Sequence, residues 1–308
     1  VSPDPDQEKS ARPICTGKSL LSSLFPPSPQ AFVMDINDLF SEINSLPSIP
    51  RVAQDLIQQF DNPHTSLDSV ARNIALDPVI AAKVLRLANS ARFRGARESA
   101  SVEDAAMRLG FNTLRTLVLA SAVTGAFQAP PGFDLKGFWA HSFQVASISR
   151  LLAKNRGVAV ETAFTCGMMH NIGELLIQTG VPELAERLNQ NGKDIGAAQR
   201  VALETLQLGF GFPEVGAELA RRWQLPELIQ QAIAYQSRPY QAPVDMPLPR
   251  VLAQAVSIAE ALREFAGDMP KAVESLQGPL FEGLDVASLL DELPAILDAD
   301  KGFAELLG

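Results

Sequence analysis

Apolar residues recur every three or four positions along most of this chain, which is the period of one face of an α-helix. Residues 51–62 illustrate the pattern, because Val52, Leu56 and Ile57 fall on one face of a helix. Residues 135–155 extend it over a longer stretch. No segment carries the alternating pattern that predicts a half-buried β-strand. The periodicity therefore predicts an all-α fold.

Capping residues and helix breakers indicate where these helices begin and end. Ser66 and Ser101 stand just before apolar-periodic segments, where a hydroxyl can accept a hydrogen bond from a free helix N–H. Pro78 suits the first position of a helix. Gly110 and Gly157 follow periodic segments, as glycine often does after the last helical residue. The predicted helices lie at about 36–46, 51–62, 66–76, 78–93, 101–109, 112–127, 135–155, 160–179, 182–190, 194–206, 213–223, 226–235 and 249–267, with further helix near the C-terminus.

Proline-rich and polar stretches divide the chain into parts. Residues 1–34 are rich in proline, serine and charge, and we expect a flexible leader there. A break around Pro130-Pro131-Gly132 predicts a boundary between two helical subdomains, residues 35–130 and residues 134–245. Residues 246–308 are expected to form a C-terminal helical extension.

Composition supports this picture and limits the classes of function. Hydrophobic residues make up 46% of the 308-residue chain, enough for a substantial core, and aromatic residues only 6%. A net charge of −9 means that nucleic acid would need a local basic patch. The best patch is Arg92, Arg94 and Arg97, with Arg86 nearby. We interpret it as a solvated loop and keep those three as a candidate interaction loop, without expecting nucleic acid.

The cellular location is inferred from cysteines and apolar runs. The two cysteines, Cys15 and Cys166, do not make a disulfide framework, which fits a reducing compartment. No apolar run approaches the roughly 20 residues that span a bilayer, and the first residues do not resemble a secretory signal. We therefore expect a cytoplasmic protein without a membrane partner.

The chemistry that the sequence offers centres on His170 and Asn171, with His141 upstream on the preceding long helix. Two imidazoles could bind a divalent metal, but an amide oxygen is a weaker ligand than a carboxylate and cannot bridge two metals in the same way. Glu174 lies four residues after His170, on the same face of a continuous helix, and could replace the missing carboxylate. The alternative is that both histidines are hydrogen-bonded core residues. Cys166 is interpreted as a buried structural residue.

Several segments resemble the HDOD family, the HD-related output domain. They are LPSIPRVAQDLIQQFDNPHTSLDSVARNIALDPVIAAKVLRLANSARF, MRLGFNTLRTLVLAS, FWAHSFQVASISRLLAK, GMMHNIGELL and GFPEVGAELARRWQLPELIQQAI, in the expected order between about residues 43 and 236. The resemblance implies a two-part helical domain, residues 35–245, whose second part is similar to an HD-type helical bundle. It also implies a non-catalytic role in bacterial signalling through protein contacts.

This chain departs from the pattern of active HD relatives at several positions. Asn171 stands where the family often has aspartate, and Glu174 where related motifs have lysine. Phe212 replaces a histidine of active phosphodiesterase relatives, and Tyr235-Gln236 replaces a frequent histidine pair. Each change removes a ligand or a charge that catalysis would use.

Our main hypothesis is a signalling output or scaffold module with a degenerate HD site formed by His141, His170, Asn171 and Glu174. We expect no catalytic residues, no cofactor and signalling proteins as partners, with the oligomeric state left open. The alternatives are a metal-dependent phosphohydrolase or phosphodiesterase, with His141 and His170 as metal ligands, and a sensor that binds a nucleotide without cleaving it.

Overall fold

The computed structural model describes residues 34–43, 46–58, 64–90, 93, 95, 97–128, 132–190, 195–243 and 246–307. The expected leader lies almost wholly outside these residues, as do Arg92 and Arg94. Every regular element in the described part is helical, so the all-α prediction is confirmed. No described helix has the length and apolar character needed to cross a membrane.

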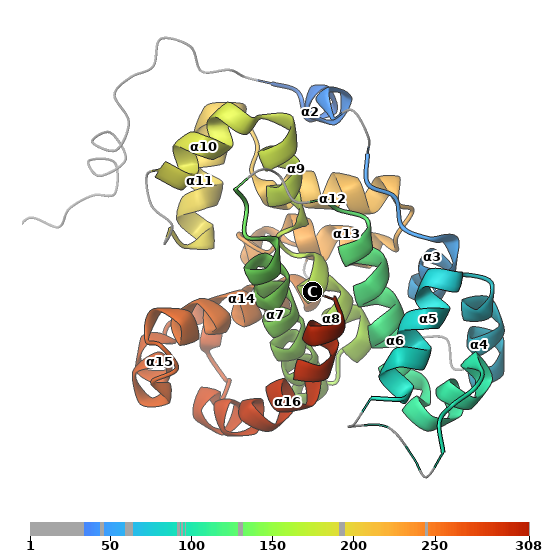
Figure 1. The fold of residues 1–308 in the computed structure, drawn as a ribbon. Coiled ribbons are helices and arrows are strands. Elements are labelled where there is room, and N and C mark those ends of the chain that lie inside the picture. The colour runs from blue at the N-terminus through green and yellow to red at the C-terminus, as the bar shows by residue number, and fades with distance from the viewer. Residues whose placement is uncertain are drawn as a thin grey trace, which may run out of the picture.

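The helices follow one another in three groups along the chain (Figure 1). The first group is α2 (Ile36–Glu42), α3 (Arg51–Gln58), α4 (Leu67–Ala75), α5 (Pro78–Ala88) and α6 (Val102–Gly125). The second is α7 (Leu135–Arg156), α8 (Val160–Met169), α9 (Ile172–Gly180), α10 (Pro182–Gln190), α11 (Ala197–Leu208), α12 (Phe212–Arg222) and α13 (Glu227–Ala234). The last is α14 (Leu248–Glu264), α15 (Met269–Ser275) and α16 (Val286–Leu307), with short 3₁₀ turns at Pro239–Gln241 and Pro279–Phe281.

Four of the predicted capping residues and helix breakers lie at helix ends in the structure. Ser66 accepts a hydrogen bond from the backbone N–H of Ser69, and Ser101 accepts one from Asp104. Pro78 occupies the first turn of α5, directly after its N-cap residue. Gly157 ends α7 in the left-handed conformation, with φ 65°. Local sequence chemistry therefore determines these boundaries.

Gly110 interrupts its helix but does not end it. Its φ of 76° interrupts the helical geometry, as expected for a residue at a helix end, but the chain resumes helix at once. The two helices predicted on either side of Gly110 are therefore the two halves of α6, joined at a kink.

The prediction of one continuous helix over residues 160–179 was wrong, because the chain breaks at His170 and Asn171. The backbone carbonyl of His170 accepts a hydrogen bond from Nε2 of Gln236 at 2.7 Å. The N–H of Glu174 donates instead to the carbonyl of Asn171. In a continuous helix the Glu174 N–H would bond to the His170 carbonyl. The side chain of Gln236 satisfies the carbonyl that the break leaves without its helical partner, and the helix restarts as α9.

The central packing brings α7 and α8 together over most of their lengths. At Gly167 on α8, a Cβ atom would lie 2.7 Å from the backbone nitrogen of Ala146 on α7, so only glycine allows this close approach. The approach aligns His141 on α7 with His170 at the end of α8. Helix α14 packs against both α7 and α8, although it belongs to the last group of helices (Figure 1).

Helix α16 contacts α7 of the second group and also α5 and α6 of the first group. It contains Pro294 in its interior. Leu290 and Leu293 of this helix are buried. The last group of helices is therefore packed into the same core as the residues before it, and it shapes the cavity described next.

Candidate functional site: a cavity beside two histidines

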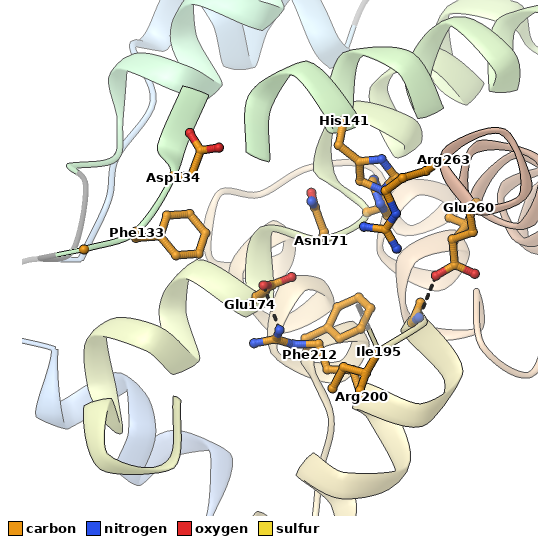
Figure 2. A pocket seen from close by; sticks show the side chains of 14 residues that line it. Phe133, Asp134, His141, Asn171, Glu174, Ile195, Arg200, Phe212, Glu260 and Arg263 are labelled. Atoms are coloured by element: carbon orange, nitrogen blue, oxygen red, sulfur yellow. Dashed lines mark hydrogen bonds and ion pairs between the residues drawn. The ribbon is translucent and has the colours of Figure 1, made fainter. Parts of the chain in front are cut away.

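A cavity of about 480 Å³ opens among α7, α9, α11, α12 and α14. Helices from the second and last groups both contribute to its walls. Figure 2 shows Phe133 and Asp134 on one side and His141 and Arg263 on the other. The lining residues are Gly132, Phe133, Asp134, His141, His170, Asn171, Glu174, Ile195, Ala197, Arg200, Phe212, Val256, Glu260 and Arg263.

His141 and His170 stack edge to face, with their ring centroids 5.5 Å apart. Burial lowers the pKa of His141 to about 4, and the positive charge of Arg263 contributes to the same shift. Burial, with a smaller effect of His141, lowers the pKa of His170 to about 3. Both imidazoles are therefore neutral at physiological pH.

A hydrogen bond determines which nitrogen of His170 carries the proton. Nδ1 lies 2.7 Å from the backbone carbonyl of Gly167, so in a neutral ring Nδ1 is protonated and donates. Nε2 then keeps its lone pair. Neutral imidazole in this tautomer is also the form in which histidine binds metals.

Asn171 occupies the position of the missing carboxylate and is almost fully buried. The Ser142 hydroxyl lies 2.9 Å from Oδ1 of Asn171 and also 2.9 Å from the carbonyl of Phe138, so it donates to one of these two acceptors. The amide therefore lies against this hydroxyl of α7. It places no negative charge beside the histidines.

Glu174 is engaged by an arginine that the sequence had not singled out. Its Oε1 lies 2.9 Å from Nη1 of Arg200, whose Nε lies 2.9 Å from the carboxylate of Glu204. Glu204 is fully buried and also accepts the backbone N–H of Phe212 at 2.7 Å. Burial raises the pKa of Glu174, and it raises that of Glu204 to about 7 against the opposing effect of Arg200. Arg200 therefore joins α9, α11 and the start of α12.

Helix α14 contributes two charged residues, Glu260 and Arg263, to the side of the cavity opposite Phe133 and Asp134 (Figure 2). Glu260 accepts the backbone N–H of Ala197 at 2.6 Å, so its carboxylate caps the start of α11. Arg263 lies one turn further along α14. Among the described residues its guanidinium makes no hydrogen bond or ion pair.

The four residues of the predicted degenerate site line the same cavity, although the chain breaks between His170 and Glu174. Phe212 also lines it. Gln236 instead binds the backbone of His170. Arg97 lies apart from the cavity, with an exposed side chain 3.9 Å from Asp104.

The sequence did not indicate the cavity residues Arg200, Glu260 and Arg263. The i, i+4 spacing of Arg200 and Glu204 was a usable signal for an ion pair, but nothing local related Arg200 to Glu174. Glu260 and Arg263 follow the segments that carry the family resemblance, so no motif included them.

The donor set does not fit a divalent metal well. Within the described ranges, no group of three or more His, Cys, Asp and Glu side chains is arranged to hold a metal ion. His141 and His170 supply two neutral nitrogens, whereas Glu174, the carboxylate nearest along the chain, is paired with Arg200. Catalytic metal sites usually have at least three protein ligands.

The HDOD domain matches residues 46–239, which is most of the chain. This protein therefore belongs to the HDOD domain family. A Shewanella amazonensis protein of known structure, provisionally named a phosphohydrolase, is 34% identical with a TM-score of 0.70 over 88% of this chain and 98% of its own. An HDOD domain protein of unknown function from Geobacter sulfurreducens shares the fold at 24% identity and a TM-score of 0.67, over 88% and 95% of the two chains.

A Marinobacter aquaeolei protein, provisionally named for signal transduction, has the same fold at 23% identity and a TM-score of 0.68, over 88% of this chain and 65% of its own. An uncharacterized Treponema pallidum protein is 26% identical over 231 residues. These cover 74% of this chain but 44% of that relative, so the chain spans less than half of the length of this curated relative. The relatives support membership of the family and leave the activity to be inferred from the site.

Proposed function

We propose that this protein is a non-catalytic signal-transduction output or scaffold module that acts through protein–protein contacts. The single observation that carries the proposal is the neutral amide of Asn171 at the carboxylate position of the HD-type site, beside the Ser142 hydroxyl. The signal-transduction name of the Marinobacter relative agrees with this role. A metal-dependent hydrolase needs a metal to activate water and offset phosphate charge, and this site offers two imidazoles for that task.

The ion pair between Glu174 and Arg200 strengthens the argument. Glu174 could complete a metal site only if it left a guanidinium that also holds the fully buried Glu204. Removing one partner from a buried ion pair costs about 3–5 kcal/mol. A metal would have to offset that cost before any affinity appeared, so Glu174 is an unfavourable substitute for the missing aspartate.

Metal content tests the non-catalytic half of this proposal. The protein is incubated with manganese, iron and zinc in turn, desalted and analysed for metal. We expect less than about a tenth of an equivalent in the wild type, because two neutral ligands hold a divalent ion weakly. Asn171→Asp should retain more metal, since it adds a carboxylate beside His170. The control variant Asn37→Asp adds the same charge at an exposed position of α2, and it should retain no more metal than the wild type. A full equivalent in the wild type that disappears in His141→Ala and His170→Ala would refute the proposal.

Affinity capture tests the protein-contact half. The full chain is used as bait in its native cytosol, and a helical protein of similar net charge serves as the control bait. We expect one or a few proteins to be enriched repeatedly over the control and then to bind the purified chain directly. If repeated captures give no such direct partner, the scaffold role loses its support.

The alternative function is a metal-dependent phosphohydrolase or phosphodiesterase. One observation favours it, namely the unprotonated Nε2 of His170 in a residue that lines the cavity. The provisional name of the Shewanella relative points in the same direction. Release of nitrophenol from bis-p-nitrophenyl phosphate, dependent on manganese and abolished by His170→Ala, would favour this alternative over our proposal.

A further inference from the structure

The cavity holds an unpaired cation beside the two histidines. Arg263 lines the cavity, and no described residue forms a hydrogen bond or ion pair with its guanidinium. The guanidinium is close enough to His141 and Glu174 for its charge to affect the pKa of both. In Figure 2 its side chain extends from α14 toward the cavity beside His141. Its donors therefore remain available to a ligand.

Arg200, the other arginine that lines the cavity, is engaged by carboxylates. It uses Nη1 for Glu174 and Nε for Glu204, and its Nη2 is buried within the protein. Arg263 is therefore the arginine of this cavity whose donors have no partner among the described residues.

The carboxylates around the cavity already have donors. Glu174 is paired with Arg200, Glu260 accepts the Ala197 N–H, and Asp134 accepts the Gly137 N–H at the start of α7. Among the charged side chains that line the cavity, Arg263 is therefore the one with no hydrogen bond or ion pair in the described part of the chain. Arginine commonly recognises carboxylate and phosphate groups, because its planar donors match their paired oxygens.

The rest of the lining suits an organic ligand better than a bare ion. Phe133 and Phe212 supply aromatic surface, and His170 presents a neutral nitrogen that can accept a hydrogen bond. The volume of about 480 Å³ lies within the range of roughly 300–1,000 Å³ that is typical of small-molecule pockets.

We propose that this cavity binds a small organic ligand through a single oxyanion group, a phosphate or a carboxylate, held by the guanidinium of Arg263. The ligand is bound without being cleaved, and this part rests on the proposed non-catalytic function. Arg263 lies one turn after Glu260 on α14, so the ligand would lie beside the existing contact between Glu260 and the start of α11.

Isothermal titration calorimetry of the full chain tests the proposal with three probes at constant ionic strength: inorganic phosphate, adenosine 5′-monophosphate and succinate. Sodium chloride is the ionic control. We expect saturable binding of at least one probe at concentrations up to about 10 mM, where a Kd near 1 mM is still measurable. Binding of phosphate or the nucleotide identifies a phosphate ligand, and binding of succinate alone identifies a carboxylate ligand.

Arg263→Gln should raise the Kd of the bound probe about tenfold or more, because it removes a charge-assisted hydrogen bond. This variant should fold normally, since Arg263 is exposed and has no partner among the described residues. Arg51→Gln is the matched control, because Arg51 is a highly exposed arginine on α3 outside the cavity. Its Kd should equal that of the wild type.

Two results would overturn the inference: no saturable binding of any probe, or binding that Arg263→Gln leaves unchanged. Chromatography of the recovered nucleotide separates this inference from the proposed function. Cleavage of the nucleotide at a rate that depends on added metal and on His170 would refute the non-catalytic function and leave the binding site standing. Absence of binding with no metal retained would refute the ligand and leave the non-catalytic function intact.

Discussion

The substitution Gly167→Ala tests the close packing that positions both histidines. An added Cβ would lie 2.7 Å from the backbone nitrogen of Ala146, closer still to its Cα, and 3.0 Å from the Ser149 hydroxyl. The Ser149 side chain can rotate, but the backbone of α7 cannot yield without moving the helix. Since carbon atoms prefer separations of about 3.5–4.0 Å, α7 and α8 would have to move apart by roughly 1 Å.

The expected loss of stability follows from this displacement. Overpacking of a core costs about 1–3 kcal/mol and sometimes more, and the α7–α8 contact is a long one that includes backbone atoms. Better helix propensity of alanine returns at most about 1 kcal/mol. The upper end of that range less this gain leaves a net loss of about 2 kcal/mol, which for a chain of this size lowers the Tm by roughly 3 °C.

Thermal unfolding followed by circular dichroism measures the effect, with Gly125→Ala as the matched control. Gly125 is the last residue of helix α6, and an added Cβ there meets nothing within 4 Å. The control should keep or slightly raise the Tm. Gly167 also accepts the Nδ1–H of His170 through its carbonyl, so nitrogen NMR of the imidazole should report a weakened preference for this tautomer in Gly167→Ala. A Tm within about 1 °C of the wild type, with an unchanged imidazole spectrum, would refute the packing argument.

Two further predictions concern the buried charges. Burial lowers the pKa of His141 to about 4 from 6.5, so between these two pH values the imidazole is protonated in the unfolded chain but not in the folded one. The free energy of unfolding therefore falls as the pH falls through this range. Urea unfolding should therefore show that the wild type loses about 2 kcal/mol more unfolding free energy than His141→Gln when the pH falls from 8 to 5. An equal loss in both proteins would contradict the buried neutral histidine. Glu204→Gln at pH 8, where Glu204 is ionised, should lose about 3 kcal/mol of unfolding free energy, because Arg200 keeps only Glu174 as a charged partner. A loss below about 1 kcal/mol would show that Arg200 does not depend on Glu204.

Local sequence chemistry predicted the fold better than it predicted the site. Ser66, Ser101 and Gly157 act within a few residues of themselves, so their effects on the chain can be derived from the sequence. The break at His170 could not be derived in this way. The carbonyl that the break leaves without its helical partner is satisfied by a side chain 66 positions away, that of Gln236, and no local pattern indicates this contact.

The same distinction explains which cavity residues were found. His141 and His170 were expected together because a family resemblance includes both of them. The contact between Glu174 and Arg200 joins two helices separated by α10, and no spacing rule predicts it. Arg263 enters through α14, which follows the segments that carry the resemblance, so its position became evident only from the packing of the last group of helices.

The charges around the cavity support one explanation for both proposals. A metal site needs carboxylates that face the metal, whereas Asn171 is neutral here and Glu174 faces a guanidinium. A cavity whose ligands suit a metal poorly, and whose Arg263 has no partner among the described residues, favours an anion instead. Under our proposals, loss of the aspartate weakens cation binding, and the ion pair of Arg200 removes the remaining substitute. The positive charge on α14 then selects a ligand of opposite sign. Because Asn171→Asp adds negative charge to the cavity, it should weaken binding of the anionic probe while it strengthens retention of metal. If Asn171→Asp strengthened both metal retention and probe binding, or weakened both, the result would contradict this explanation, which requires the two effects to have opposite signs.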